Sequence, residues 1–110
     1  MLRSIVGAAV LLAWAGLAVA ADDAKVTKGT QVYADQKCAM CHSIGDKGNK
    51  KGPLDGVASK YSADDLRAWV VDAKGMTTKT KSARVPAMKN YQLPKDDVDA
   101  LVAYMATLKK

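Results

Sequence analysis

Two cysteines and a histidine are the residues of this chain best suited to carry chemistry, and they stand almost side by side. Cys38, Cys41 and His42 fall within the run Cys-Ala-Met-Cys-His, and the chain has no other cysteine or histidine. A redox dithiol of the thioredoxin kind belongs to an α/β pattern, with a strand before the motif and a helix after it. Here the preceding stretch, 27–37, has helical character. Structural zinc normally takes four ligands, and these residues supply only three.

The same five residues match the pattern of covalent haem attachment, C-x-x-C-H. In that chemistry each thiol adds across one vinyl group of the porphyrin, and the two-residue spacer places both sulfurs along one edge of the ring. The adjacent histidine then lies under the iron as its axial ligand. The motif therefore predicts one covalent haem c held by Cys38, Cys41 and His42.

The second axial position of the iron needs a different residue type, because His42 is the only histidine. Met, Lys and Asn are the protein ligands that remain, unless the position stays open. A methionine thioether favours ferrous iron and so raises the reduction potential. Met40 lies inside the attachment loop and cannot reach the opposite face, and Met105 falls on an apolar helical stripe where core packing explains it.

Met76 and Met88 are the remaining methionines of the expected mature domain. Met88 follows Pro86 in a stretch expected to be a loop, and proline stiffens such a segment by fixing φ. Met76 follows Gly75, which is flexible. The sequence favours Met88 as the sixth ligand, with Met76 as the alternative.

Residues 1–20 have the pattern of a secretory signal peptide. Arg3 precedes an apolar run, and Ala18-Val19-Ala20 supplies small residues for cleavage after Ala20. The rival interpretation is an uncleaved membrane anchor, but the run is short for a span of about 20 residues. We expect a cleaved leader, a periplasmic domain over residues 21–110, and no membrane span after cleavage.

The elements expected to position these residues are helices, with no convincing alternating strand pattern. A first helix is predicted over 26–37, after frayed residues 22–26, and it delivers Cys38. A second helix starts at Ser62, where Asp65 completes a capping-box-like pattern, and Gly75 ends it. The last helix begins near Pro94 and carries an apolar stripe at helical spacing: Val98, Leu101, Val102, Met105 and Leu108.

The predicted fold is therefore all-α, with three to four short helices and long loops over 43–60 and 76–93. Long loops are unusual in a compact domain unless something holds them. A domain this small also often needs a cofactor to be stable. A bound haem would meet both needs.

The charge of the chain is basic. Its formal net charge is +6, its acidic residues are all aspartates, and only one cation, Arg3, lies in the expected leader. Such a surface suits an acidic protein, nucleic acid or an anionic membrane. The export signal argues against nucleic acid.

From about Gly29 to Leu108 the chain resembles the class I c-type cytochromes of bacteria. Gly29 and Tyr33 resemble the glycine and aromatic residue of the family's N-terminal helix, which packs across the C-terminal helix near Tyr104. Cys38 to His42 is the attachment motif. Gly52-Pro53-Leu54 resembles the family's Gly-Pro segment, in which the proline carbonyl accepts a hydrogen bond from the proximal imidazole.

The segment from Val85-Pro86-Ala87-Met88 to Leu101-Val102-Ala103-Tyr104 resembles the family's methionine-ligand loop and closing helix. Two departures stand out. The chain after Gly52-Pro53 is one residue shorter than the commonest spacing, and Pro94 stands where a serine or threonine usually caps the helix. Neither departure touches the ligands.

The resemblance implies a monomeric periplasmic electron carrier, not an enzyme, with iron ligated by His42 and Met88. From the charge of the chain alone, we expect its partners to be redox proteins with an acidic docking face, met by lysines near the haem edge: Lys37, Lys50, Lys51 and Lys89. The alternatives are a haem subunit of a larger periplasmic dehydrogenase or oxidase complex, and a haem-based gas sensor or small peroxidase with an open sixth position.

Overall fold

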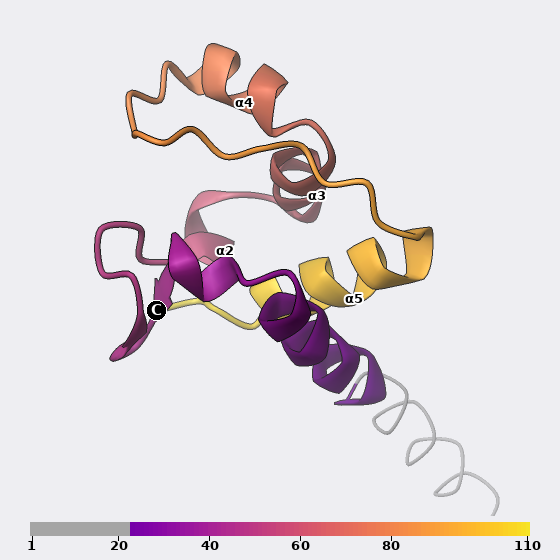
Figure 1. The fold of residues 1–110 in the computed structure, drawn as a ribbon. Coiled ribbons are helices and arrows are strands. Elements are labelled where there is room, and N and C mark those ends of the chain that lie inside the picture. Colours follow the sequence, from indigo (N-terminus) through magenta and orange to yellow (C-terminus); the bar gives the residue numbers. More distant parts are fainter. Residues whose placement is uncertain (1–22) are drawn as a thin grey trace, which may run out of the picture.

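The computed structural model describes residues 23–110, and the predicted signal peptide at 1–20 lies outside them (Figure 1). A helix covers residues 23–35. The remaining elements are the 3-10 helix η1 (Cys38–Met40), strands β1 (Ser43–Ile44) and β2 (Lys47–Gly48), and helices α2 (Val57–Lys60), α3 (Ala63–Val71), α4 (Ala73–Thr80) and α5 (Lys95–Met105). The predicted all-α class is confirmed, because the only strands in this part of the chain form one short antiparallel hairpin. None of the helices described is long and apolar enough to cross a membrane.

The starts of α3 and α5 agree with the sequence prediction. The Asp65 N–H donates to Ser62 Oγ at 3.2 Å, which caps α3. The α5 helix follows Pro94 directly and has Asp96 and Asp97 in its first turn, where negative charge suits the helix dipole.

The first helix lies earlier in the chain than predicted. It covers 23–35 instead of 26–37, so residues 23–26 are helical and not frayed. It ends before Lys37 because that residue adopts a left-handed conformation, with φ of 56°. Such a residue commonly terminates a helix. The reversal turns the chain directly into Cys38.

Two helices lie where loops were expected. Gly75 does not end a helix: α3 stops at Val71, and Asp72 begins α4 by accepting from the Gly75 N–H at 3.2 Å. Met76 is therefore a buried helical residue and not part of a loop. The short α2 helix interrupts the other expected loop, 43–60.

The core forms where α5 meets α3 and the N-terminal helix, which lie together in Figure 1. A Cβ on Gly29 would collide with the Ala100 carbonyl oxygen and Tyr104, so only glycine allows this close crossing. Tyr33 and Tyr104 pack edge to face beside it, with ring centroids 5.8 Å apart. The predicted contact between the terminal helices is confirmed.

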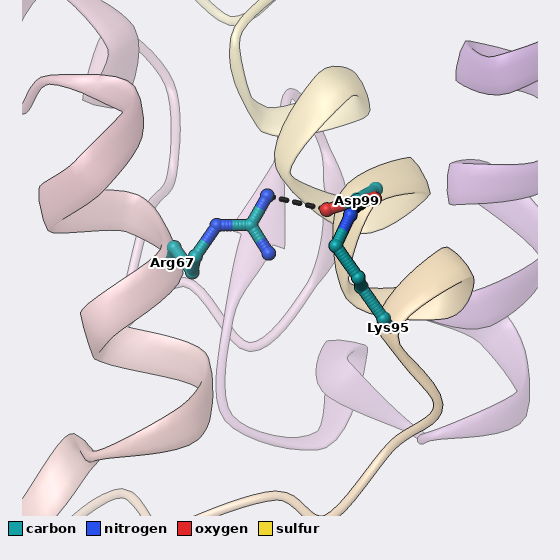
Figure 2. A network of polar contacts seen from close by, with 3 residues as sticks. All are labelled: Arg67, Lys95 and Asp99. Carbon is teal, nitrogen blue, oxygen red and sulfur yellow. Dashed lines mark hydrogen bonds and ion pairs between the residues drawn. The ribbon is translucent and has the colours of Figure 1, made fainter.

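A surface ion-pair network also joins α3 to α5 (Figure 2). Asp99 Oδ2 accepts a hydrogen bond from Lys95 Nζ at 2.7 Å, and Asp99 Oδ1 accepts one from Arg67 Nη2 at 2.5 Å. Side-chain hydrogen bonds from Lys95 and Arg67 lower the pKa of the Asp99 carboxyl. The helices that frame the cavity described below are thus also linked by charge.

Candidate functional site

The attachment motif forms one tight turn. The His42 N–H donates to the Cys38 carbonyl at 2.9 Å, and the Cys41 N–H donates to the same carbonyl at 3.1 Å. Cys38 is half-buried, Cys41 is exposed, and both thiols are free. The two sulfurs and the imidazole therefore come from one compact segment, as attachment to a single group requires.

The attachment turn is held in place by the β1–β2 hairpin and by Asn49, which follows it. The Asn49 N–H donates to the carbonyls of Ala39 (3.0 Å) and His42 (2.9 Å), and Asn49 Nδ2 donates to the Met40 carbonyl at 3.1 Å. Gly48 allows the close approach, because its φ is 101° and a Cβ there would collide with the His42 carbonyl. The attachment turn is thereby held by three hydrogen bonds from Asn49, the residue that follows β2.

The imidazole of His42 is oriented by a backbone carbonyl. His42 Nδ1 donates to the Gly52 carbonyl at 3.1 Å, so the expected acceptor, the Pro53 carbonyl, is wrong by one residue. The Ser43 N–H also donates to Gly52, at 3.1 Å, and the Leu54 N–H donates to Ser43, at 2.8 Å. This bonding to Ser43 fixes which carbonyl faces the ring.

That hydrogen bond leaves His42 Nε2 available as a metal ligand. Burial lowers the pKa of His42, and the nearby Arg84 lowers it further, while the bond to Gly52 opposes them. A lowered pKa keeps the imidazole neutral, which is the form that binds a metal.

The predicted ligands line two adjoining cavities of about 380 and 340 Å³, each of a size typical of small-molecule sites. Cys38, His42 and Met88 line both of them, and Cys41 lines the second. The structure thus brings together all four residues predicted from the sequence, although Met88 lies 46 positions beyond His42.

The other methionines are placed differently. Met76 is only 7% exposed on α4 and lines neither cavity, while Met105 is a core residue of α5 that borders the first. Met40 is 70% exposed at the edge of the second cavity. Of the two candidates left open by the sequence, Met88 is the one that borders both cavities.

Two buried polar atoms test whether these cavities suit a haem. Tyr33 Oη and Trp69 Nε1 are shielded from solvent and have no hydrogen-bond partner among the described residues, and both side chains line the first cavity. An unpaired buried donor costs about 1–3 kcal/mol. Burial, chiefly, raises the pKa of Tyr33 to about 12, so its hydroxyl keeps its proton. A haem, with its apolar ring and two carboxylates, fits a cavity of apolar walls and unused donors.

Sequence reasoning missed one side chain that enters this region. The Arg84 guanidinium donates to the Cys41 carbonyl and lies against Gly52, where a Cβ would collide with it. In the sequence, Arg84 is one of several cations in the expected loop 76–93. Nothing local to Arg84 indicates a contact with a residue 43 positions away.

The attachment motif stands apart from any ordinary metal cluster. Within residues 23–110, no three or more histidine, cysteine or carboxylate side chains are grouped so that they could hold a bare metal ion. The preceding helix, 23–35, also differs from the strand that a thioredoxin-like dithiol would require.

Comparison with known proteins adds one match. The family model described as Cytochrome c matches residues 26–109, which is most of the chain. No curated protein and no solved structure shows a significant match.

Proposed function

We propose, from the premise that this chain belongs to the cytochrome c family, that it is a periplasmic monohaem carrier whose iron is ligated by His42 and Met88. Family membership makes electron transfer by a covalently bound haem c the activity of the domain. The finer proposal rests on one observation: both ligands line the same pair of cavities, beside both cysteines of the attachment motif.

The chain's residues would divide the work as follows. Cys38 and Cys41 would hold the group covalently, and His42, oriented by the Gly52 carbonyl, would ligate the iron from the attachment side. Met88, from the loop between α4 and α5, would supply the second protein ligand. When bound, the haem supplies one-electron exchange between ferric and ferrous iron. If both ligands stay bound in the two oxidation states, the structural change between those states would be small.

The partner surface proposed here surrounds the mouth of the second cavity. Lys37 and Lys89 line it together with the apolar side chains Met40, Pro86 and Ala87. An apolar centre with cations beside it suits a redox protein that presents carboxylates around an apolar patch. Lys50 and Lys51, also expected near the edge, are exposed but line neither cavity, so we give them a smaller role.

The proposed location is the periplasm. Cytochrome c domains typically lie there or outside the cell, and the leader-like pattern at 1–20 accounts for export of this chain. Mass spectrometry of the purified holoprotein should give a chain that begins at Ala21 and carries one haem. A chain that retains residues 1–20 would support the anchor interpretation instead.

The ligand assignment is tested by the visible and near-infrared spectrum of the oxidised holoprotein. Sulfur bound to ferric iron gives a weak far-red band, which should be present in the wild type and in Met76→Leu but absent in Met88→Leu. Leucine keeps a similar side-chain volume, so both variants retain their packing. A band that persists in Met88→Leu would refute the assignment.

A second candidate is a haem subunit of a larger dehydrogenase or oxidase complex. Val85 is 88% exposed and Met40 70% exposed, and such apolar residues beside the site would also suit a permanent interface. Gel filtration of the protein from its source separates the two: a carrier elutes as a monomer and a subunit elutes in a complex.

A further inference from the structure

Residues 81–93, which contain Met88, form the methionine loop. Asn90 and Tyr91 join this loop to the break between α3 and α4. Asn90 Oδ1 accepts a hydrogen bond from the Lys74 N–H at 2.9 Å. The Tyr91 N–H donates to the Val70 carbonyl, also at 2.9 Å. We call residues 90–91 the clamp.

The clamp uses backbone groups that a helix cannot satisfy by itself. The Lys74 N–H lies in the first turn of α4, and the Val70 carbonyl lies in the last turn of α3. Groups at these positions have no hydrogen-bond partner within their own helix, so they are free to bond to the clamp. Asp72 already caps the Gly75 N–H from inside the same segment. Asn90 adds a second cap, and this one comes from a residue 16 positions away.

The rest of the methionine loop is held much less. Among residues 23–110, no backbone–backbone hydrogen bond involves residues 83–89, and the last one before them joins the Ser82 N–H to Thr77 at 3.1 Å. Between Ser82 and Met88 the loop is held by one side-chain bond, from the Arg84 guanidinium to the Cys41 carbonyl. Beyond them Tyr91 packs against the core, and Lys89 Nζ lies 4.9 Å from the centre of its ring. Met88 is therefore two residues from a fixed point on its C-terminal side and six from the backbone bond on the other.

We infer that Asn90 is a positioning residue for the sixth ligand: by capping α4 it holds the end of the loop where Met88 can stay bound. This rests on the proposed ligation by Met88. Without the Asn90 side chain, the Tyr91 bond alone would fix the end of the loop. Met88 would then leave the iron more often, while His42 and the attachment motif would be unaffected.

The chain offers a matched control, because Asp72 and Asn90 each supply one acceptor to the first turn of α4. Asp72→Ala removes a cap without releasing the loop, whereas Asn90→Ala removes a cap and the tether together. Asn90→Asp retains an acceptor oxygen and serves as the rescue variant.

Two measurements on the holoprotein separate the roles. The first is the rate at which carbon monoxide binds the ferrous protein, since Met88 must leave before it can bind. The second is the guanidinium concentration at which the far-red band disappears, compared with that at which helical circular dichroism is lost. If Asn90 only stabilised the fold, its loss would lower the guanidinium midpoints of the far-red band and of the circular dichroism by the same amount.

For Asn90→Ala we expect carbon monoxide to bind about fivefold faster, the size of effect that loss of one capping side chain typically has on an equilibrium. The far-red band should also disappear well before the helices unfold. Asp72→Ala should lower both transitions equally, and Asn90→Asp should behave like the wild type.

Equal behaviour of Asn90→Ala and Asp72→Ala, with Met88 ligation intact in the wild type, would overturn the clamp alone. A far-red band that survives Met88→Leu would overturn the ligand assignment, and the clamp with it. The two failures are thus told apart by the wild-type and Met88→Leu spectra.

Discussion

The segment that carries His42 and the segment that carries Met88 reach the same cavities but are fixed in different ways. Around His42, Asn49 and the Gly52–Leu54 segment bond to the backbone of His42 and Ser43, and the Gly52 carbonyl also bonds to the ring. Around Met88, the chain between α4 and α5 runs as a long trace without helix (Figure 1). Its backbone is bonded near its two ends, and between them the Arg84 side chain bonds to the Cys41 carbonyl. We call the well-bonded attachment segment, residues 38–54, the frame. We call the less bonded methionine loop, residues 81–93, the strap.

This difference has a functional meaning for a carrier of electrons. A rigid attachment side would hold the His42 imidazole and both cysteine side chains in place, so that they would rearrange little during electron exchange. A strap held by few bonds is the part in which a small change alters ligation. Variants that change the potential or open the sixth position are expected in 81–93, and variants that prevent folding are expected in 38–54.

The largest effect should follow from damage to the frame at Gly48. An alanine there would take a φ of 101° and would collide with the His42 carbonyl. Such strain costs about 1–3 kcal/mol, so Gly48→Ala should lower the free energy of unfolding by at least that range, measured by guanidinium denaturation. Gly45→Ala is the matched control, because its φ of 59° is also positive but open space surrounds it. Equal losses of unfolding free energy in Gly48→Ala and Gly45→Ala would show that the close contact between Gly48 and the His42 carbonyl does not matter for stability.

A medium effect should follow from removing cations at the mouth of the second cavity. Lys37→Gln with Lys89→Gln should slow oxidation of the ferrous protein by ferricyanide, a small anion, about tenfold at low ionic strength, because electrostatic steering is lost. The difference should disappear as salt is added, since exposed charges are then screened.

Two other pairs calibrate that result. Lys109→Gln with Lys110→Gln removes the same charge from exposed positions that line neither cavity and should change the rate less. Lys50→Gln with Lys51→Gln should fall between them. A flat salt dependence in the wild type would remove the proposed acidic partner.

The smallest effect concerns the ion-pair network between α3 and α5. The pKa of Asp99 is lowered in the folded protein by its bonds to Lys95 and Arg67. Its contribution is therefore present above the unfolded value of about 3.9 and is lost as pH falls through the lower folded value. The melting temperature of Asp99→Asn should fall below that of the wild type near neutral pH, and the gap should close on acidification below about pH 4.

Asp46→Asn is the control for the pH dependence expected of Asp99→Asn. Asp46→Asn removes an exposed aspartate of the hairpin turn that forms no ion pair within the described part of the chain. Its melting temperature should follow the wild type from pH 7 to pH 3. A constant gap between Asp99→Asn and the wild type over the same range would show that the network stabilises by packing and not by charge.

Features with a local signal were predicted from the sequence. The attachment motif is five consecutive residues, the Ser62 cap lies three positions from its donor, and the α5 stripe repeats at helical spacing. The crossing at Gly29 came from the family resemblance, and the structure supplies its cause in the Ala100 carbonyl.

Features that depend on distant or dual contacts were not predicted. The sequence predicts a helix end at Gly75, because a glycine commonly follows a helix. In the structure Asp72 both ends α3 and caps α4, which places Gly75 in the first turn of α4. The bond from Lys74 to Asn90 joins loop and helix across 16 positions, and that from Arg84 to Cys41 spans 43. No periodicity or cap pattern encodes such pairs.

The central claim is that His42 and Met88 ligate the iron from a frame and a strap. X-ray absorption at the iron edge of the oxidised holoprotein tests it most directly, because it identifies the atoms bound to the metal. The account predicts one sulfur scatterer in the first shell of the wild type and of Met76→Leu, and none in Met88→Leu. A first shell without sulfur in the wild type, or sulfur that remains in Met88→Leu, would contradict it.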